Sequence, residues 1–350
     1  MTTLSSPFEG AGGARSRATM RDVAALAGVS LKTVSRVINR EAGVSDELVA
    51  RVARAAEQLD YRPNLTASNL RRSDRRTGTV GLLVEDVANE FFAAIHRGVE
   101  EVARQRGAAV VAASLDRDPA VERDLVSAFA SRRVDGLILA PTAPQQGYLH
   151  TEVRSGWPIV CIDRQPSGIE LDAVVTDNRE SSAVGVAHLI AHGHRRVAFI
   201  GGRPSLTTEQ DRFVGYADAM ANAGLAVRPE WVHHGALDSD DAKGVMLALL
   251  DLPEPPTAVF SGQNLITMGV VRALRARGLE HQVGLVGFDD FMLADLLDPA
   301  ITVVAQDARA IGHVAAELLY RRMDSIDEPA TTHVVPSRLV TRGSGEIRLA

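Results

Sequence analysis

Residues 22–39, DVAALAGVSLKTVSRVIN, decide the fold of the N-terminal part of this 350-residue chain. Thr19 and Asp22 have the spacing of a capping box, which predicts that a helix begins there. Gly28 should end that helix, and Ser30 is placed to cap a second one. Two short helices joined by a three-residue turn that contains glycine are typical of a helix-turn-helix.

A third helix should follow Ser45. The apolar side chains expected to face the core of this unit are Val23, Leu26, Ala27, Val34, Val37, Ile38, Val49, Val52, Ala53, Ala56 and Leu59. The second helix exposes side chains of the kinds that read base edges and bind phosphates, namely Lys32, Thr33, Ser35, Arg36 and Asn39. Residues 1–76 hold 13 Lys+Arg and 8 Asp+Glu, a net charge of +5, whereas the rest of the chain has a net charge of −11. A basic head on an acidic body favours a polyanionic partner for the head.

Residues 20–62 strongly resemble the DNA-binding head of the LacI/GalR family of bacterial regulators. By that resemblance, the base-reading positions of the recognition helix are Leu31, Lys32 and Arg36. The positions that mostly contact phosphates are Thr33, Ser35 and Asn39. Leu31 would suit an apolar contact with a thymine methyl group.

Residues 63–72, PNLTASNLRR, are too short to form a stable helix alone, so a flexible linker is one interpretation. The segment also resembles the hinge helix of the same family, which orders on operator DNA. By that resemblance Leu70 is the wedge that enters the minor groove and kinks the duplex, and Ala67 packs near it. The arginines that follow would supply charge toward the phosphates.

From Thr79 onward, short apolar runs alternate with helical stretches. The candidate strands are 79–84, 108–113, 136–140, 159–162, 174–176, 197–200, 257–261, 283–287 and 301–304. Runs this apolar, separated by helices, indicate parallel strands that are buried on both faces. Two groups of such units predict two doubly wound lobes, in which ligands bind beyond the carboxyl ends of the strands.

Polar or aromatic residues follow most of these strand ends. They are Asn89, Phe91, Phe92, Asp163, Arg164, Arg212, Gln263, Asp289 and Gln306. Each sugar hydroxyl both donates and accepts a hydrogen bond, so carboxylates, guanidinium groups and amides must converge around it. Aromatic faces cover the C–H faces of the ring. These residue types therefore predict a sugar site in a cleft between the lobes.

The body resembles the effector domain of the same family and the periplasmic sugar-binding proteins, with ribose binders similar at the ligand positions. Three departures from that pattern stand out. Gln263 replaces an asparagine and Asn264 replaces an aspartate. No aromatic residue occurs near positions 237–240, where the second lobe often has one that stacks on the sugar.

The predicted fold is an all-α helix-turn-helix head joined to an α/β body like the periplasmic binding proteins, with two doubly wound parallel-sheet lobes. Residues 1–17 are expected to be a disordered tail, 18–62 the DNA-binding domain, 63–77 the hinge helix and linker, and 78–350 the effector-binding and dimerisation domain. The first lobe is assigned residues 78–176 plus 301–330. The second lobe is assigned residues 177–300 plus the C-terminal segment.

Several other site types are disfavoured by the sequence. His188, His192 and His194 have a metal-like spacing but no acidic ligand beside them in the sequence, so no metal site is expected. The single cysteine, Cys161, lies in an apolar strand and excludes an intramolecular disulfide. No set of nucleophile, base and orienting residue is present, so neither an enzyme nor a cofactor is expected. There is no secretory signal and no membrane-spanning run, so a cytoplasmic location is expected.

These observations predict a homodimeric transcriptional repressor that binds palindromic operator DNA and responds to a small sugar or related polyol. Two heads are needed because one such module buries too little surface for tight, selective DNA binding. Three alternatives remain open. They are a regulator that needs no ligand, a sugar-binding protein with a vestigial head, and a sugar-modifying enzyme.

Overall fold

The computed structural model describes residues 18–38, 43–61, 76–324 and 328–349. The chain divides into two compact units, Met1–Thr77 and Gly78–Ala350, which we call the head and the body. This division coincides with the boundary expected between residues 77 and 78.

The described part of the head contains α1 (Met20–Ala27), α2 (Leu31–Ile38) and α3 (Asp46–Gln58). The capping box is confirmed, because Thr19 N–H donates to Asp22 Oδ2 at 2.8 Å and Asp22 N–H donates to Thr19 Oγ1 at 3.4 Å. Gly28 ends α1 with a left-handed φ of 61°, a conformation that glycine adopts without strain. Ser30 Oγ accepts the N–H of Thr33 at 3.1 Å and thereby caps α2 as expected.

The core of the head is narrower than the sequence pattern suggests. Leu26 and Val49, both expected inside, are 50% and 41% exposed. Ala53 also faces solvent, and Ala55 is buried in its place. In the described part of the head, α3 packs against two short helices and buries a stripe at a spacing of three residues, Val52 and Ala55.

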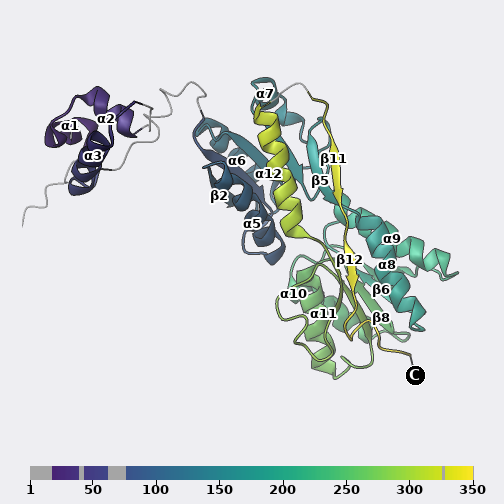
Figure 1. The fold of residues 1–350 in the computed structure, drawn as a ribbon. Helices are drawn as coiled ribbons and strands as arrows, with labels where there is room; N and C mark the ends of the chain where they lie inside the picture. The colour runs from purple at the N-terminus through teal and green to yellow at the C-terminus, as the bar shows by residue number, and fades with distance from the viewer. Residues whose placement is uncertain (1–17, 39–42, 62–75, 325–327, 350) are drawn as a thin grey trace, which may run out of the picture. The chain divides into compact units, whose positions relative to one another are not determined.

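The body contains two six-stranded sheets, one in each lobe (Figure 1). The first has the order β11-β5-β4-β3-β1-β2, with β1 (Thr79–Val84), β2 (Ala109–Ser114), β3 (Gly136–Leu139), β4 (Ile159–Ile162), β5 (Asp172–Thr176) and β11 (Thr332–Val335). The second has the order β12-β10-β9-β8-β6-β7, with β6 (Val197–Ile200), β7 (Val232–His233), β8 (Ala258–Ser261), β9 (Gly284–Phe288), β10 (Thr302–Ala305) and β12 (Arg338–Val340). All pairings are parallel except β10 with β12.

Helices cover the sheets of both lobes. Those of the first lobe are α5 (Glu90–Gln105), α6 (Pro119–Ser131), α7 (His150–Arg154) and α12 (Ala308–Asp324). Those of the second lobe are α8 (Asn178–Ala191), α9 (Thr207–Asn222), α10 (Ser239–Leu250) and α11 (Asn264–Arg277). Short 3₁₀ helices occupy Gly147–Leu149 and Pro229–Trp231. The central strands β1, β3, β4, β8 and β9 are buried almost throughout, as their apolar sequences predict.

Two glycines allow α12 to return from the second lobe and pack closely on α5 (Figure 1). A Cβ atom at Gly98 would lie 2.2 Å from the carbonyl oxygen of Arg309, and one at Gly312 would lie 2.1 Å from that of Ile95. The two backbones therefore meet where neither residue has a side chain. This contact fixes the C-terminal part of the chain to the first lobe.

Within the described residues of the body, the chain passes between the lobes after β5, after β10 and between β11 and β12. The sequence analysis assigned residues 301–330 to the first lobe. This is wrong for β10, because β10 pairs with β9 and β12 in the second sheet. The crossing comes only at α12. The sequence pattern does not predict the strands β7, β11 and β12, because they are short and partly exposed and lack long apolar runs.

Candidate functional site

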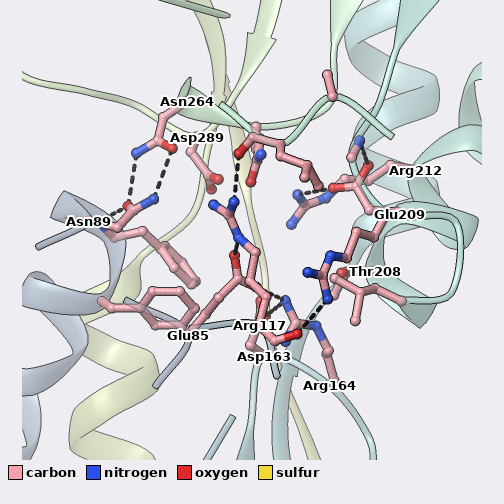
Figure 2. Close-up of a pocket in the computed structure, with 18 residues that line it drawn as sticks. Glu85, Asn89, Arg117, Asp163, Arg164, Thr208, Glu209, Arg212, Asn264 and Asp289 are labelled. Atoms are coloured by element: carbon pink, nitrogen blue, oxygen red, sulfur yellow. Dashed lines mark hydrogen bonds and ion pairs between the residues drawn. The ribbon is translucent and has the colours of Figure 1, made fainter. Parts of the chain in front are cut away.

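A cavity of about 550 Å³, part of it open to solvent, lies between the lobes of the body at the carboxyl ends of the strands (Figure 2). This is where doubly wound sheets bind ligands. The residues that line it are Glu85, Asn89, Phe91, Phe92, Arg117, Asp163, Arg164, Gly202, Arg203, Leu206, Thr208, Glu209, Arg212, Ala236, Leu237, Gln263, Asn264 and Asp289.

The structure brings eight of the nine predicted ligand residues to this cavity. These are Asn89, Phe91, Phe92, Asp163, Arg164, Arg212, Gln263 and Asp289. Gln306 does not line the cavity. Its Nε2 instead donates to Asp289 Oδ1 at 2.6 Å, so it positions the carboxylate that does.

An acidic side chain that the sequence did not single out organises the first-lobe wall. Glu85, directly after β1, accepts from Arg117 Nε at 2.7 Å and from Arg164 Nη2 at 3.0 Å. Burial by itself would raise the pKa of Glu85, but the two guanidinium charges outweigh it and hold the pKa below the usual value. Arg164 also donates to the carbonyl of Pro141 at 2.9 Å, which fixes its orientation toward the cavity.

Asp163 and Asp289 occupy equivalent places in the two lobes. Asp163 directly follows β4 with a φ of 66°, and Asp289 directly follows β9 with a φ of 68°. Each N–H donates at 2.9 Å to a neighbouring strand, Asp163 to the carbonyl of Val174 and Asp289 to that of Val304. Non-glycine residues adopt this left-handed conformation rarely, and often at binding sites. The two strained turns place a buried carboxylate on each side of the cavity.

Arg212 of α9 is fixed by three contacts in the second lobe. Its Nε donates to Asn178 Oδ1 at 2.8 Å and its Nη1 donates to the carbonyl of Gly262 at 2.7 Å. The guanidinium carbon also lies 3.9 Å from the centre of the Phe288 ring, a cation–π distance. These contacts fix the orientation of the Arg212 guanidinium group.

The apolar part of the lining is uneven. Phe91 and Phe92 contact each other edge to face, with ring centres 5.1 Å apart, and both belong to the first lobe. On the second-lobe side, the lining residues include Leu206 and Leu237 but no aromatic residue. Leu237 lies within positions 237–240, where the family resemblance implies a stacking aromatic residue that this chain lacks.

Sequence reasoning did not find Glu85, Arg117, Arg203, Thr208 and Glu209 among the lining residues. For Glu209 a signal was available, since it lies one helical turn before Arg212 and so shares its face of α9. Arg117 and Arg203 gave no signal, because each is held by residues far away in the sequence. Arg117 Nη1 donates to the carbonyl of Leu237 at 2.8 Å, and Arg203 Nη1 donates to the carbonyl of Arg117 at 2.6 Å.

In the head, α2 exposes the predicted recognition face. Leu31 and Lys32 are exposed, whereas Thr33, Ser35 and Arg36 are partly exposed. Thr33 is held by the cap, since its Oγ1 lies 2.9 Å from Ser30 Oγ. The predicted DNA contacts Asn39, Ala67 and Leu70 lie outside the described residues.

Two of the three histidines in residues 188–194 hold the C-terminal segment. His188 Nε2 lies 2.8 Å from Glu346 Oε1, and His194 Nε2 lies 2.8 Å from the carbonyl of Ile347. Among the described residues, no group of three or more His, Cys, Asp or Glu side chains is arranged to hold a metal ion. Within the same residues, no helix combines the length and the apolar surface that crossing a membrane requires.

Two family models match the chain. The model for bacterial regulatory proteins of the lacI family matches residues 19–64, and a periplasmic binding protein-like domain matches residues 186–345. The repressor PurR of Aliivibrio fischeri is 30% identical over 332 residues, which cover 93% of this chain and 98% of that protein.

Solved structures agree with these matches. The transcriptional regulator CelR, solved with cellobiose, is 32% identical, with a TM-score of 0.69 and coverage of 94% of this chain and 100% of that one. The lac repressor dimer, solved with operator and the anti-inducer ONPF, is 25% identical, with a TM-score of 0.81 and coverage of 96% and 100%. The chain therefore belongs to the lacI family of bacterial regulatory proteins, and it is a DNA-binding transcriptional repressor that a small-molecule effector regulates.

Proposed function

We propose that the effector is a small sugar or related polyol, which binds in the cavity between the lobes and controls the binding of a homodimer to palindromic operator DNA. The observation that carries this proposal is the composition of the cavity wall. Four carboxylates and four guanidinium groups line it, namely Glu85, Asp163, Glu209 and Asp289 with Arg117, Arg164, Arg203 and Arg212.

Hydroxyl groups suit such a wall because each can donate to a carboxylate and accept from a guanidinium group at the same time. The equal number of opposite charges favours an uncharged ligand over a highly charged one. Phe91 and Phe92 supply an apolar surface for the C–H groups of the ligand on one side only. The relative CelR, solved with cellobiose, also supports a carbohydrate ligand.

The DNA part of the proposal rests on the head. α2 presents Lys32 and Arg36 on one face, with Leu31 42% exposed beside them. We propose that Leu31, Lys32 and Arg36 read bases, and that Thr33, Ser35 and Asn39 contact phosphates and fix the register. In residues 63–72, we assign Leu70 as the minor-groove wedge, with Ala67 beside it. Because the target is DNA, the proposed location is the cytoplasm.

The test combines a thermal-shift screen with operator binding. D-ribose, other pentoses, hexoses, polyols and their phosphates are added to the purified full-length protein. A ligand at 100 times its dissociation constant stabilises the folded protein by about 2.7 kcal/mol. The operator is first selected from random DNA, and the compound that raises the melting temperature should also change operator affinity. A full screen with no shift, together with intact operator binding, would instead establish a regulator that needs no ligand.

The same experiment separates the remaining alternatives. A sugar-binding protein with a vestigial head would show a thermal shift but no salt-dependent DNA binding. We also propose that the bound compound is not transformed. Recovery of a chemically changed compound after prolonged incubation with the protein would establish an enzyme instead.

A further inference from the structure

Glu209 is a buried carboxylate in the cavity wall that no family motif identified. It is the third residue of α9 and only 5% exposed. In Figure 2 it lies beside Arg212 on the second-lobe side of the cavity. A buried carboxylate costs free energy unless hydrogen bonds and opposite charges compensate it. The contacts of the Glu209 carboxylate therefore show how far its burial is compensated.

The backbone around Glu209 leaves room for its carboxylate. Cβ atoms added at Gly201, Gly202 and Gly262 would lie 3.1, 3.2 and 3.0 Å, respectively, from atoms of its carboxyl group. The N–H of Gly202 donates to Oε2 at 2.7 Å. One carboxylate oxygen is thus held by the backbone, in a space that side chains at these three positions would narrow.

The other oxygen is not held in this way. Arg212 Nη1 approaches Oε1 only to 3.5 Å, because Arg212 donates its hydrogen bonds to Gly262 and Asn178 instead. No described residue donates a hydrogen bond to Oε1. Asp289 repeats the pattern, since Gln306 donates to its Oδ1 and no described residue donates to its Oδ2. Two carboxylates of the second lobe therefore each have one oxygen to which no described residue donates.

The negative charge of each of these two carboxylates is only partly compensated by the groups around it. Burial raises the pKa of Glu209 and of Asp289, and Arg212 only partly offsets the effect. The charged groups that face Glu209 are Arg212 on its own helix, Arg164 of the first lobe and Asp289 beyond β9. A ligand that donates hydrogen bonds would supply the missing compensation.

We propose that Glu209 determines specificity by accepting, through Oε1, a hydrogen bond from a hydroxyl group of the effector, so that the effector presents a hydroxylated edge to the second lobe rather than an apolar ring face. This inference rests on the proposed function and deepens it. It is consistent with the missing aromatic residue on the second-lobe side, because Glu209 adds a hydrogen-bond acceptor to a wall that has no stacking surface. Asp289 is the expected acceptor for a second hydroxyl.

The first experiment needs no ligand and compares Glu209→Gln with Glu317→Gln. The Glu209→Gln change keeps an acceptor for the N–H of Gly202, but it removes the charge. Glu317 is an exposed carboxylate on α12, away from the cavity, and serves as the matched control. The raised pKa means that ionised Glu209 destabilises the folded state, so wild-type stability is lost as the pH rises through the folded pKa. Glu209→Gln should therefore melt roughly 2–4 °C higher than wild type at pH 7.5, and this difference should vanish at pH 4. A lower melting temperature at pH 7.5 would show that Glu209 is a structural anchor and would overturn the proposal.

The second experiment measures ligand binding with a fixed panel of D-ribose, D-xylose, D-fructose, myo-inositol and glycerol. For each compound that raises the wild-type melting temperature, calorimetry should show at least a roughly tenfold weaker affinity for Glu209→Gln. Glu317→Gln should bind like wild type. Wild-type affinity should also fall as the pH falls through the pKa of Glu209. The fall should be smaller for Glu209→Gln, in which Asp289 still loses its charge on acidification.

The outcomes separate this inference from the proposed function. If a compound binds wild type and Glu209→Gln equally, the sugar site stands and the role of Glu209 is rejected. If no compound of the panel binds wild type, the hydroxyl-bearing effector is rejected, and the role of Glu209 with it.

Discussion

Asn89 and Asn264 join the two lobes by a reciprocal pair of hydrogen bonds between their side-chain amides. Asn264 Nδ2 donates to Asn89 Oδ1 at 3.0 Å, and Asn89 Nδ2 donates to Asn264 Oδ1 at 3.3 Å (Figure 2). Each oxygen also accepts a backbone N–H at the start of a helix, from Phe91 in α5 and from Leu265 in α11. The pair therefore couples the first turns of two helices across the cavity.

This relationship predicts that the pair stabilises the arrangement of the two lobes. Asn264→Ala removes both interlobe bonds and leaves Asn89 Nδ2 without its partner, which should cost about 1–3 kcal/mol of stability. Amide hydrogen exchange at the start of α11 should become faster in the full-length protein. Asn264→Asp is the control, because its carboxylate still accepts from Asn89 Nδ2. Equal exchange in wild type and Asn264→Ala would show that the pair does not hold the lobes together.

A second interlobe connection, through Arg117, predicts a pH-dependent loss of stability. Arg117→Met removes one of the two cations that lower the pKa of Glu85 and also breaks the bond to the carbonyl of Leu237. A carboxylate with a lowered folded pKa stabilises the fold above its unfolded pKa, and this stability is lost as the pH falls through the folded pKa. The variant should therefore be less stable than wild type at pH 7.5, by about 1–3 kcal/mol.

The difference should shrink as the pH is lowered through the range in which Glu85 protonates. Urea unfolding at a series of pH values measures it. Arg106→Met, a change at an arginine that is about half exposed, is the control. A constant difference at all pH values would mean that Arg117 acts only through packing and through its bond to Leu237.

The head yields a prediction about specificity. Lys32→Ala and Arg36→Ala should each weaken binding to the selected operator by about 1–3 kcal/mol if their side chains contact bases. Their affinity for random DNA should change much less. Arg51→Ala, a change on the exposed side of α3, is the control for simple loss of positive charge. Equal losses on operator and random DNA, measured by titration at fixed salt, would assign both residues to phosphates.

The hinge segment, which lies outside the described residues, yields a separate prediction. Leu70→Ala should weaken operator binding and reduce the bend of the DNA, because the wedge area exists only in the complex. Effector binding in the absence of DNA should not change. Gel phasing measures the bend angle, and an unchanged angle would rule out the wedge.

The sequence predicted the position of the cavity well because the signals for it are local. Short apolar runs mark the buried strands, and the polar residue that follows each run marks a carboxyl end, as Asp163 and Asp289 show. Interactions between distant residues escaped prediction. Glu85 meets Arg164 79 residues away, and nothing near either residue indicates that contact.

The strands next to the sheet edges, β5 and β10, were only partly predicted for the same reason. β5 begins at Asp172, two residues before the expected start, because Arg322 pairs with the buried carboxylate from 150 residues away. Without that partner, an aspartate in a buried strand would be unfavourable. Likewise, β10 was placed in the wrong lobe because its apolar sequence does not show which sheet it joins.

The last prediction concerns His194, which holds the C-terminal segment of the second lobe. The side chain is fully buried, and its Nε2 lies 2.8 Å from the carbonyl of Ile347, while Nδ1 lies 3.1 Å from Thr257 Oγ1. The neutral tautomer with hydrogen on Nε2 satisfies both contacts, since Nδ1 can accept from the hydroxyl. Burial lowers the pKa of His194, so the folded state favours the neutral ring.

For a base whose folded pKa is lowered, stability is fully present above the unfolded pKa and is lost as the pH falls through that value toward the folded pKa. Wild type should therefore lose stability as the pH falls below about 6.5, the usual pKa of an unfolded histidine. His194→Gln can still donate to Ile347 but does not titrate, so it should be less stable at pH 7.5 and lose less on acidification. His150→Gln, at an exposed histidine on α7, should follow the wild-type profile. Thermal melts at half-unit pH steps measure the three profiles, and parallel curves for wild type and His194→Gln would show that another group causes the acid sensitivity.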